Sequence, residues 1–217
     1  MAGHLCRIER PSFEHGRSTV LFGGMSQIAD VGQGAHLCVY YDNDEARASL
    51  VAAYVAIGLD HNERCLCVAE DAVLLDIVAA LVELGVDAAA ERQAGRLLMF
   101  PPSEAHLQGG RFDAEGMLKM LDDTVERALD EGFSGLRAAG DMSWILEGAP
   151  GTERVFEYEA MMNGFYPTSR AVGMCLYDRR LLPASALEKA LHTHPVVGEN
   201  GRVFANPHFD PANQPGS

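Results

Sequence analysis

The sequence predicts an α/β protein with three layers, α/β/α, around a mainly parallel sheet. Short runs of β-branched and apolar residues alternate along the chain with segments of helical period, which is typical of helices packed on a parallel sheet. The length of 217 residues suits one domain, since single cores usually stop growing near about 250 residues. A hydrophobic fraction of 47% with 22% charged residues indicates a chain that buries a sizeable core.

Five segments are predicted to be the strands of this sheet. They are His36–Tyr41, Arg64–Ala69, Arg96–Phe100, Gly135–Ala139 and Ala171–Tyr177. The stretch 194–207 is predicted to form a short C-terminal β-hairpin that turns at Glu199-Asn200-Gly201, because Asn-Gly between apolar runs favours a tight turn. We expect this hairpin to add antiparallel strands to one edge of the sheet.

Helical periodicity fills the segments between the strands. The predicted helices span about 44–59, 71–84, 113–131, 152–165 and 183–191. Asp42 or Asp44 can cap the first helix, Asp71 the second and Asp113 the third, while Pro183 suits the first position of the last helix. Between strand and helix, residues 101–112 form a connection of unusual length, which favours a functional loop over a plain surface excursion.

Charge and composition exclude several classes of protein. The net charge of −14 repels phosphate backbones, so direct nucleic-acid binding is not expected. We find neither a signal peptide nor an apolar run long enough to span a membrane, and therefore expect a cytoplasmic protein. The acidic excess lies beyond residue 34, which suggests an N-terminal extension (1–34), a main domain (35–210) and a C-terminal tail (211–217).

The turn after the first predicted strand lacks the features of a phosphate-binding loop. Such a loop needs glycines for close backbone approach and a lysine to meet the phosphates. Here the turn is Asp42-Asn43-Asp44-Glu45, whose carboxylates occupy the positive end of the helix dipole. A phosphate-loop nucleotide hydrolase is therefore not expected.

In open α/β sheets, ligands bind beyond the carboxyl ends of the strands. Asp141 and Trp144, the only tryptophan, follow the fourth predicted strand, where the ring can wall an apolar pocket and the carboxylate can accept a hydrogen bond. The alternative is a core tryptophan beside a helix-capping aspartate. Tyr41, Tyr177 and Glu159 belong to further aromatic and acidic pairs near the strand ends or on a helix.

Catalytic and metal motifs are weak in this sequence. No serine has a G-x-S-x-G elbow around it, so we assign no catalytic residues. His192, His194 and His208 could hold a metal, but a histidine that follows a helix more often caps its last carbonyls, and we assign no metal site. Cys38, Cys65, Cys67 and Cys175 lie in predicted strands and are expected to be buried thiols.

Ten short motifs, in order over about residues 34–209, resemble the MEDS family, the sensory domain shared by methanogen, methylotroph and dichloromethane-regulator proteins. They are His36-Leu37-Cys38-Val39-Tyr40-Tyr41-Asp42, Glu63-Arg64-Cys65-Leu66, Gly95-Arg96-Leu97, Gly110-Arg111-Phe112-Asp113, Gly135-Leu136-Arg137, Gly140-Asp141-Met142-Ser143-Trp144, Tyr158-Glu159, Cys175-Leu176-Tyr177-Asp178, Thr193-His194-Pro195 and Asn206-Pro207. The resemblance implies a RecA-like core with a degenerate phosphate loop, acting as an input domain for small organic molecules. Such domains often sit beside a DNA-binding domain or a histidine kinase.

We therefore expect a non-catalytic sensory domain that binds a small organic ligand, one-carbon or hydrocarbon-derived, and signals to a kinase or transcription-regulator partner. A homodimer is compatible with this role, and no cofactor is identified. The ligand-binding residues that we predict are Tyr41, Asp42, Asp141, Trp144, Glu159, Tyr177 and His194. Two alternatives stay open: a metal-dependent enzyme that uses the acidic strand ends with His194 or His106, and a protein-interaction module without a small ligand.

Overall fold

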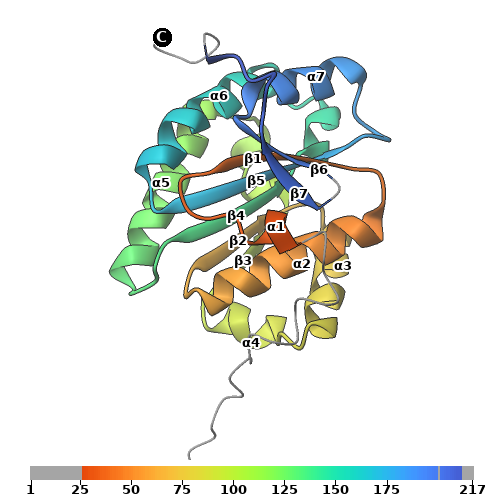
Figure 1. Ribbon diagram of the computed structural model, residues 1–217. Helices are drawn as coiled ribbons and strands as arrows, with labels where there is room; N and C mark the ends of the chain where they lie inside the picture. The colour runs from red at the N-terminus through yellow and green to blue at the C-terminus, as the bar shows by residue number, and fades with distance from the viewer. Residues whose placement is uncertain (1–25, 200, 212–217) are drawn as a thin grey trace, which may run out of the picture.

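A computed structural model describes residues 26–199 and 201–211 (Figure 1). In this part of the chain, seven strands form one sheet in the order β3-β2-β4-β5-β1-β6-β7. The strands are β1 His36–Tyr41, β2 Arg64–Val68, β3 Leu97–Phe100, β4 Leu136–Asp141, β5 Ala171–Asp178, β6 Val196–Glu199 and β7 Arg202–Ala205. All neighbouring pairs are parallel except β6 and β7. The predicted α/β fold with a mainly parallel sheet is confirmed.

The C-terminal hairpin is present, with one correction to its expected pairing. β6 and β7 pair antiparallel with each other, but β6 lies parallel to β1, with Leu37 opposite Val196. Only β7 is therefore antiparallel to the rest of the sheet. Asn200, in the predicted turn, lies outside the described residues.

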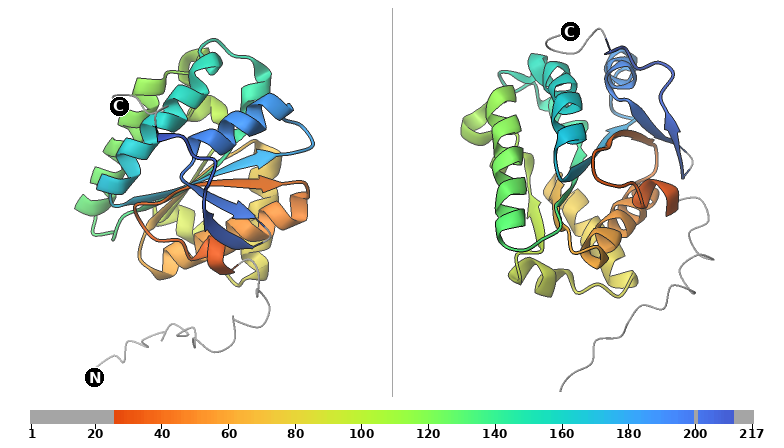
Figure 2. Two further views of the ribbon diagram at one scale, coloured as in Figure 1. Left: turned by 45° about the horizontal axis from the view of Figure 1, so that its top comes forward. Right: turned by 60° about the vertical axis from the view of Figure 1, so that its left-hand side comes forward.

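Helices cover both faces of the sheet (Figure 2). The helices are α1 Ser26–Ala29, α2 Asp44–Asp60, α3 Asp71–Glu83, α4 Ala88–Gln93, α5 Ala114–Asp130, α6 Val155–Phe165 and α7 Ala184–Thr193. The apolar residues of α2 and α3 pack on one face, and those of α5, α6 and α7 on the other. We call these the α2–α3 face and the α5–α6 face.

The helix caps agree in part with the sequence. Asp113 caps α5 as predicted, since its carboxylate accepts a hydrogen bond from the Gly116 amide at 3.2 Å. For α2, the cap is Asn43 rather than either neighbouring aspartate, with its side-chain oxygen 2.8 Å from the Ala46 amide. Asp71 is the first residue of α3 and not its cap, and Pro183 precedes α7 rather than opening it.

A buried ion pair ties the segment before β1 to the sheet. Arg137 on β4 donates to Glu63 at 2.5 Å and to the carbonyl of Ala29 in α1 at 3.0 Å, and its guanidinium lies over the ring of Tyr54. Ile28 and Ala29 are buried in the core of the α2–α3 face. Part of the predicted N-terminal extension therefore packs against the domain, while residues 1–25 lie outside the described chain. No helix among the described residues is both long and apolar enough to cross a membrane.

Candidate functional site

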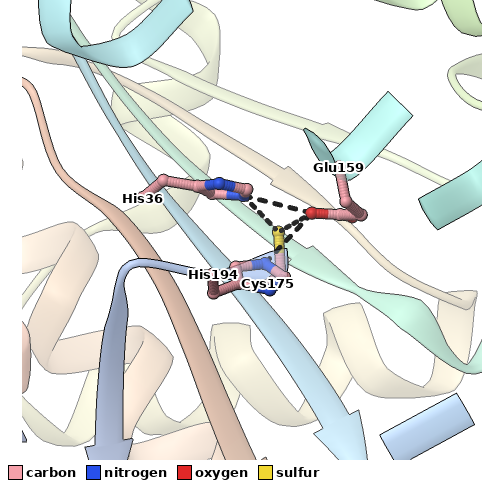
Figure 3. A group of neighbouring side chains, drawn as sticks. All are labelled: His36, Glu159, Cys175 and His194. Atoms are coloured by element: carbon pink, nitrogen blue, oxygen red, sulfur yellow. Dashed lines mark hydrogen bonds and ion pairs between the residues drawn. The ribbon is translucent and has the colours of Figure 1, made fainter. Parts of the chain in front are cut away.

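Four side chains with metal-ligating atoms meet on the α5–α6 face of the sheet. They are His36 from β1, Cys175 from β5, Glu159 from α6 and His194, which follows α7 (Figure 3). Their nearest ligating atoms all lie within 4.8 Å of one another. Parallel pairing of β1 and β5 places His36 opposite Gly173, two residues before Cys175, so both side chains face the same helices.

The carboxylate of Glu159 stands at the centre of this group. Its Oε2 atom is 3.1 Å from Nε2 of His36, 3.0 Å from Nε2 of His194 and 3.4 Å from Sγ of Cys175. Sγ of Cys175 also lies 3.5 Å from Nε2 of His36. The side chains of Glu159 and His194 are fully buried.

Hydrogen bonds on the far side of each imidazole fix its orientation. Nδ1 of His194 lies 2.8 Å from the carbonyl oxygen of Ala190, and Nδ1 of His36 lies 2.9 Å from Oδ1 of Asn163. The Asn163 amide nitrogen donates to the Thr193 carbonyl at 2.7 Å, which turns its oxygen toward His36. A carbonyl oxygen can only accept, so both histidines carry a proton on Nδ1 and turn Nε2 toward the group. The expectation that His194 caps the preceding helix is consistent with this contact.

Burial controls the protonation of the group. It lowers the pKa of His36, and the neighbouring His194 lowers it further, so His36 is neutral near pH 7. Burial, reinforced by the charge of Glu159, raises the pKa of the Cys175 thiol. With no cation present, Cys175 is therefore a thiol that faces a carboxylate and the lone pair of His36.

Residues of the two central strands are partly accessible on the same face. Ala138 and Gly140 on β4 and Cys175 on β5 are each partly accessible, although these strands lie in the middle of the sheet. Their neighbours on the opposite face are closely packed: Ala139 is 5% exposed and Met174 is 1% exposed. The α5–α6 face is therefore the more open of the two.

Unpartnered polar atoms lie in the same layer of the molecule. The Trp144 ring, which is 1% exposed, stacks on His106 with 4.8 Å between ring centroids. His106 also lies close to β4, since its Cε1 atom is 3.9 Å from the position that a side-chain Cβ would take at Gly140. Tyr177 lies two residues beyond Cys175 on β5, with its ring 5.8 Å from that of His194. Buried polar atoms that have no hydrogen-bond partner among the described residues include His106 Nδ1, Trp144 Nε1, Glu159 Oε1, Tyr177 Oη and His194 Nε2. Such atoms mark a place for a bound molecule or ordered water.

The carboxyl edge of the sheet forms a different group on the opposite face. Tyr41 donates to Asp141 at 2.6 Å, and Asp141 also accepts from the Ser143 amide at 3.0 Å and so caps the turn that contains Trp144. A hollow of about 10 Å³ beside Arg47 and Asp141 has room for about one water molecule. The polar groups at this edge therefore already pair with one another.

The seven residues predicted to bind ligand therefore do not share one site. Glu159, Tyr177, His194 and Trp144 lie on the α5–α6 face, and Tyr41 and Asp141 on the α2–α3 face, whereas Asp42 is exposed in the turn after β1. The set of residues predicted to bind ligand left out His36, Cys175 and His106, of which His106 entered only in the metal-dependent alternative and Cys175 only as a buried thiol. The signal in the sequence that could have indicated these residues was weak: a polar residue in each of two apolar strands, His36 and Cys175, and a histidine, His106, in the long loop after β3.

The fold is similar to that of a KaiC-like protein. A solved KaiC-like protein from the hyperthermophilic archaeon Pyrococcus horikoshii OT3 aligns with a TM-score of 0.52 over 76% of this chain and 70% of that chain, at 11% identity. This likeness agrees with the RecA-like core that the resemblance implies. No curated protein sequence matches the chain.

Residues 35–195 match the model of the MEDS family, the methanogen/methylotroph, DcmR sensory domain. The match covers well over half of the chain, so the protein belongs to this family. The sensory class that the ordered motifs implied is thereby confirmed.

Proposed function

We propose that this domain senses a small organic molecule in the space between the central strands β4 and β5 and the helices of the α5–α6 face. One observation carries the proposal: partly accessible residues in the middle of the sheet lie in the same layer as buried polar atoms without partners. Natural interiors rarely leave such atoms unpaired. Membership in a sensory family supports the same role.

The surroundings favour a small, largely apolar ligand with one polar group. Apolar and aromatic residues of this face, Trp144, Phe112 and Met142 among them, surround the layer, while Tyr177 and His106 supply polar atoms that can orient the ligand. This composition suits a one-carbon or hydrocarbon-derived compound. The carboxyl edge of the sheet, where we first expected the ligand, is the poorer candidate because its polar groups already pair with one another.

We also infer that the phosphate loop of the RecA-like core is degenerate here. Only Asp42 and Asn43 separate β1 from α2, too few residues to wrap a phosphate group. The nearby cations are already paired: Arg180 with Asp44 at 2.7 Å and with Asp178 at 2.6 Å, and Arg47 with Asp44 at 3.1 Å. Acidic side chains therefore occupy the helix N-terminus where an anion would bind.

The output of the domain is proposed to be a protein partner, a kinase or a transcription regulator, in keeping with the sensory family. The outer side of α5 exposes acidic residues, including Glu115, Asp122, Glu126 and Asp130. A partner that docks there would be basic, and its affinity would fall with added salt. We place the protein in the cytoplasm, in agreement with such a partner.

Fluorescence of Trp144 tests the proposed ligand site. The protein is titrated with methanol, methylamine and dichloromethane, and at least one compound is expected to shift the emission in a saturable way. Tyr177→Phe removes a hydroxyl that has no hydrogen-bond partner in the described part of the chain. The fold should therefore persist while affinity falls about 2- to 10-fold, the contribution of one hydrogen bond.

The matched control is Tyr54→Phe, whose hydroxyl donates to the Val172 carbonyl at 3.3 Å on the α2–α3 face. This variant should bind as tightly as the parent protein. Unchanged affinity in Tyr177→Phe together with weakened affinity in Tyr54→Phe would move the ligand to the opposite face. Saturable binding that leaves Trp144 emission unchanged would also contradict the proposed site.

A further inference from the structure

We propose that His36, Glu159, Cys175 and His194 form a tetrahedral site for a divalent transition metal of the zinc type. This inference goes beyond the proposed function, because it rests on the convergence of four side chains and holds whichever molecule the adjoining space takes up. Neither sequence motifs nor the family description point to such a centre.

The distances between the ligating atoms fit a shared ion. Zinc bonds of about 2.0–2.3 Å place tetrahedral ligands about 3.3–3.6 Å apart. Four of the six separations are 3.1 and 3.0 Å from Glu159 to the two histidines, 3.4 Å from Glu159 to Cys175 and 3.5 Å from Cys175 to His36, and all ligating atoms lie within 4.8 Å of one another. Small movements of the side chains would therefore admit the ion at the centre.

The hydrogen-bond pattern turns the ligating atoms toward one point. Both imidazoles donate from Nδ1 to a neighbouring oxygen, so the Nε2 atom of each faces the Glu159 carboxylate, to which the Cys175 thiol also donates. Nε2 of His194 lies 3.0 Å from Oε2 of Glu159, and both atoms can ligate the same ion when the imidazole is neutral.

The surroundings of the two histidines match those of metal ligands. In proteins, a ligating histidine usually donates its other N–H to a carbonyl or a carboxylate, which fixes its tautomer and raises its basicity. His36 makes this contact with Asn163 and His194 with the carbonyl of Ala190. Both ligating nitrogens are thereby oriented before any ion binds.

Charge and ligand type favour zinc over harder cations. A thiolate with two imidazoles suits zinc and related transition metals, whereas calcium and magnesium require oxygen ligands. Binding converts the Cys175 thiol into a thiolate and releases its proton to solvent. The thiolate and the Glu159 carboxylate then balance the two charges of the ion, so the buried site is neutral overall.

Cobalt(II) substitution tests the site on the whole chain. Protein stripped of metal by a chelator is titrated with Co²⁺, and we expect one ion per chain, the intense visible bands of tetrahedral cobalt and a thiolate charge-transfer band. Zn²⁺ should displace the cobalt and raise the melting temperature of the stripped protein. Failure of the parent protein to bind Co²⁺ stoichiometrically, or a weak octahedral spectrum, would overturn the proposal.

Two variants assign the ligands. Cys175→Ser should abolish the charge-transfer band, whereas the control Cys67→Ser, a buried thiol on the α2–α3 face, should keep it. Asn163→Leu removes the partner of His36 and should weaken metal affinity about 10- to 100-fold. If Cys175→Ser retained the band, or if Cys67→Ser lost it equally, the thiolate would come from elsewhere and the site would be refuted.

Discussion

Two neighbouring alanines on β4 test whether the α5–α6 face holds the space that the ligand site requires. Ala138 faces that space and is partly accessible, whereas Ala139 faces the closely packed side and is 5% exposed. Replacing each by valine adds two methyl groups. Because both positions lie on one central strand, the difference between the two variants reports the packing on each face of the sheet.

The packing on each face sets the expected magnitudes. At Ala138, two methyl groups can enter the space and stabilise the fold by up to about 1.6 kcal/mol, since a buried CH₂ contributes about 0.8 kcal/mol. At Ala139, the adjoining hollow has room for about one water molecule, and overpacking should cost about 1–3 kcal/mol. We therefore expect Ala138→Val to be more stable than Ala139→Val by about 2–4 kcal/mol.

Urea unfolding followed by far-ultraviolet circular dichroism measures the difference between the two variants. Ala138→Val should also weaken binding of any compound that shifts Trp144 emission, because the methyl groups fill the site. If Ala138→Val were destabilised as much as Ala139→Val, the α5–α6 face would be packed as closely as the other face. The reasoning from partial accessibility would then be wrong.

Three further predictions concern protonation, a buried ion pair and nucleotide binding. Burial lowers the pKa of His106 from 6.5 to about 4, so the unfolded chain binds more protons between these values. The free energy of unfolding is therefore highest above pH 6.5 and falls by up to about 3 kcal/mol as the pH drops through this range. Urea melts of His106→Phe should show no such contribution from position 106. Glu63→Gln leaves the buried charge of Arg137 unpaired and should lower the free energy of unfolding by about 3–5 kcal/mol. Asp123→Asn, whose ion pair with Lys119 is exposed, should lower it by no more than about 0.5 kcal/mol. Equal unfolding free energies for the two variants would contradict this. Calorimetry with Mg-ATP should detect no binding at micromolar concentrations, and a saturable isotherm would restore a nucleotide role to the turn after β1.

The sequence predicted the strands and most helices because their signals are local. Short runs of mainly apolar and aromatic residues mark β1 and β5, and the Asp113 cap with its apolar stripe marks α5. The pairing of the hairpin was harder to foresee, since an Asn-Gly turn specifies how two strands pair with each other and not which existing strand they join. In the structure, β6 joins β1 in the parallel sense.

The site was predictable only in part because strand and turn geometry separate residues that are close in sequence. Asp141 ends β4 and its side chain meets Tyr41 on the α2–α3 face, while Trp144, three residues later in a 3₁₀ turn, packs on the α5–α6 face. His36 and Cys175 are 139 residues apart and adjoin only through the register of β1 and β5. Neither residue lies in a sequence motif typical of metal binding, so their proximity is a property of the fold.

The location of a bound halogenated one-carbon compound tests the central claim of a sensing site on the α5–α6 face most directly. Crystals of the protein soaked with dibromomethane would show each bromine by its anomalous signal. The account predicts bromine peaks in the space beside Ala138, Gly140 and Cys175, within contact of Tyr177 or His106. Peaks confined to the carboxyl edge near Arg47 and Asp141, or no ordered bromine in the molecule, would contradict it.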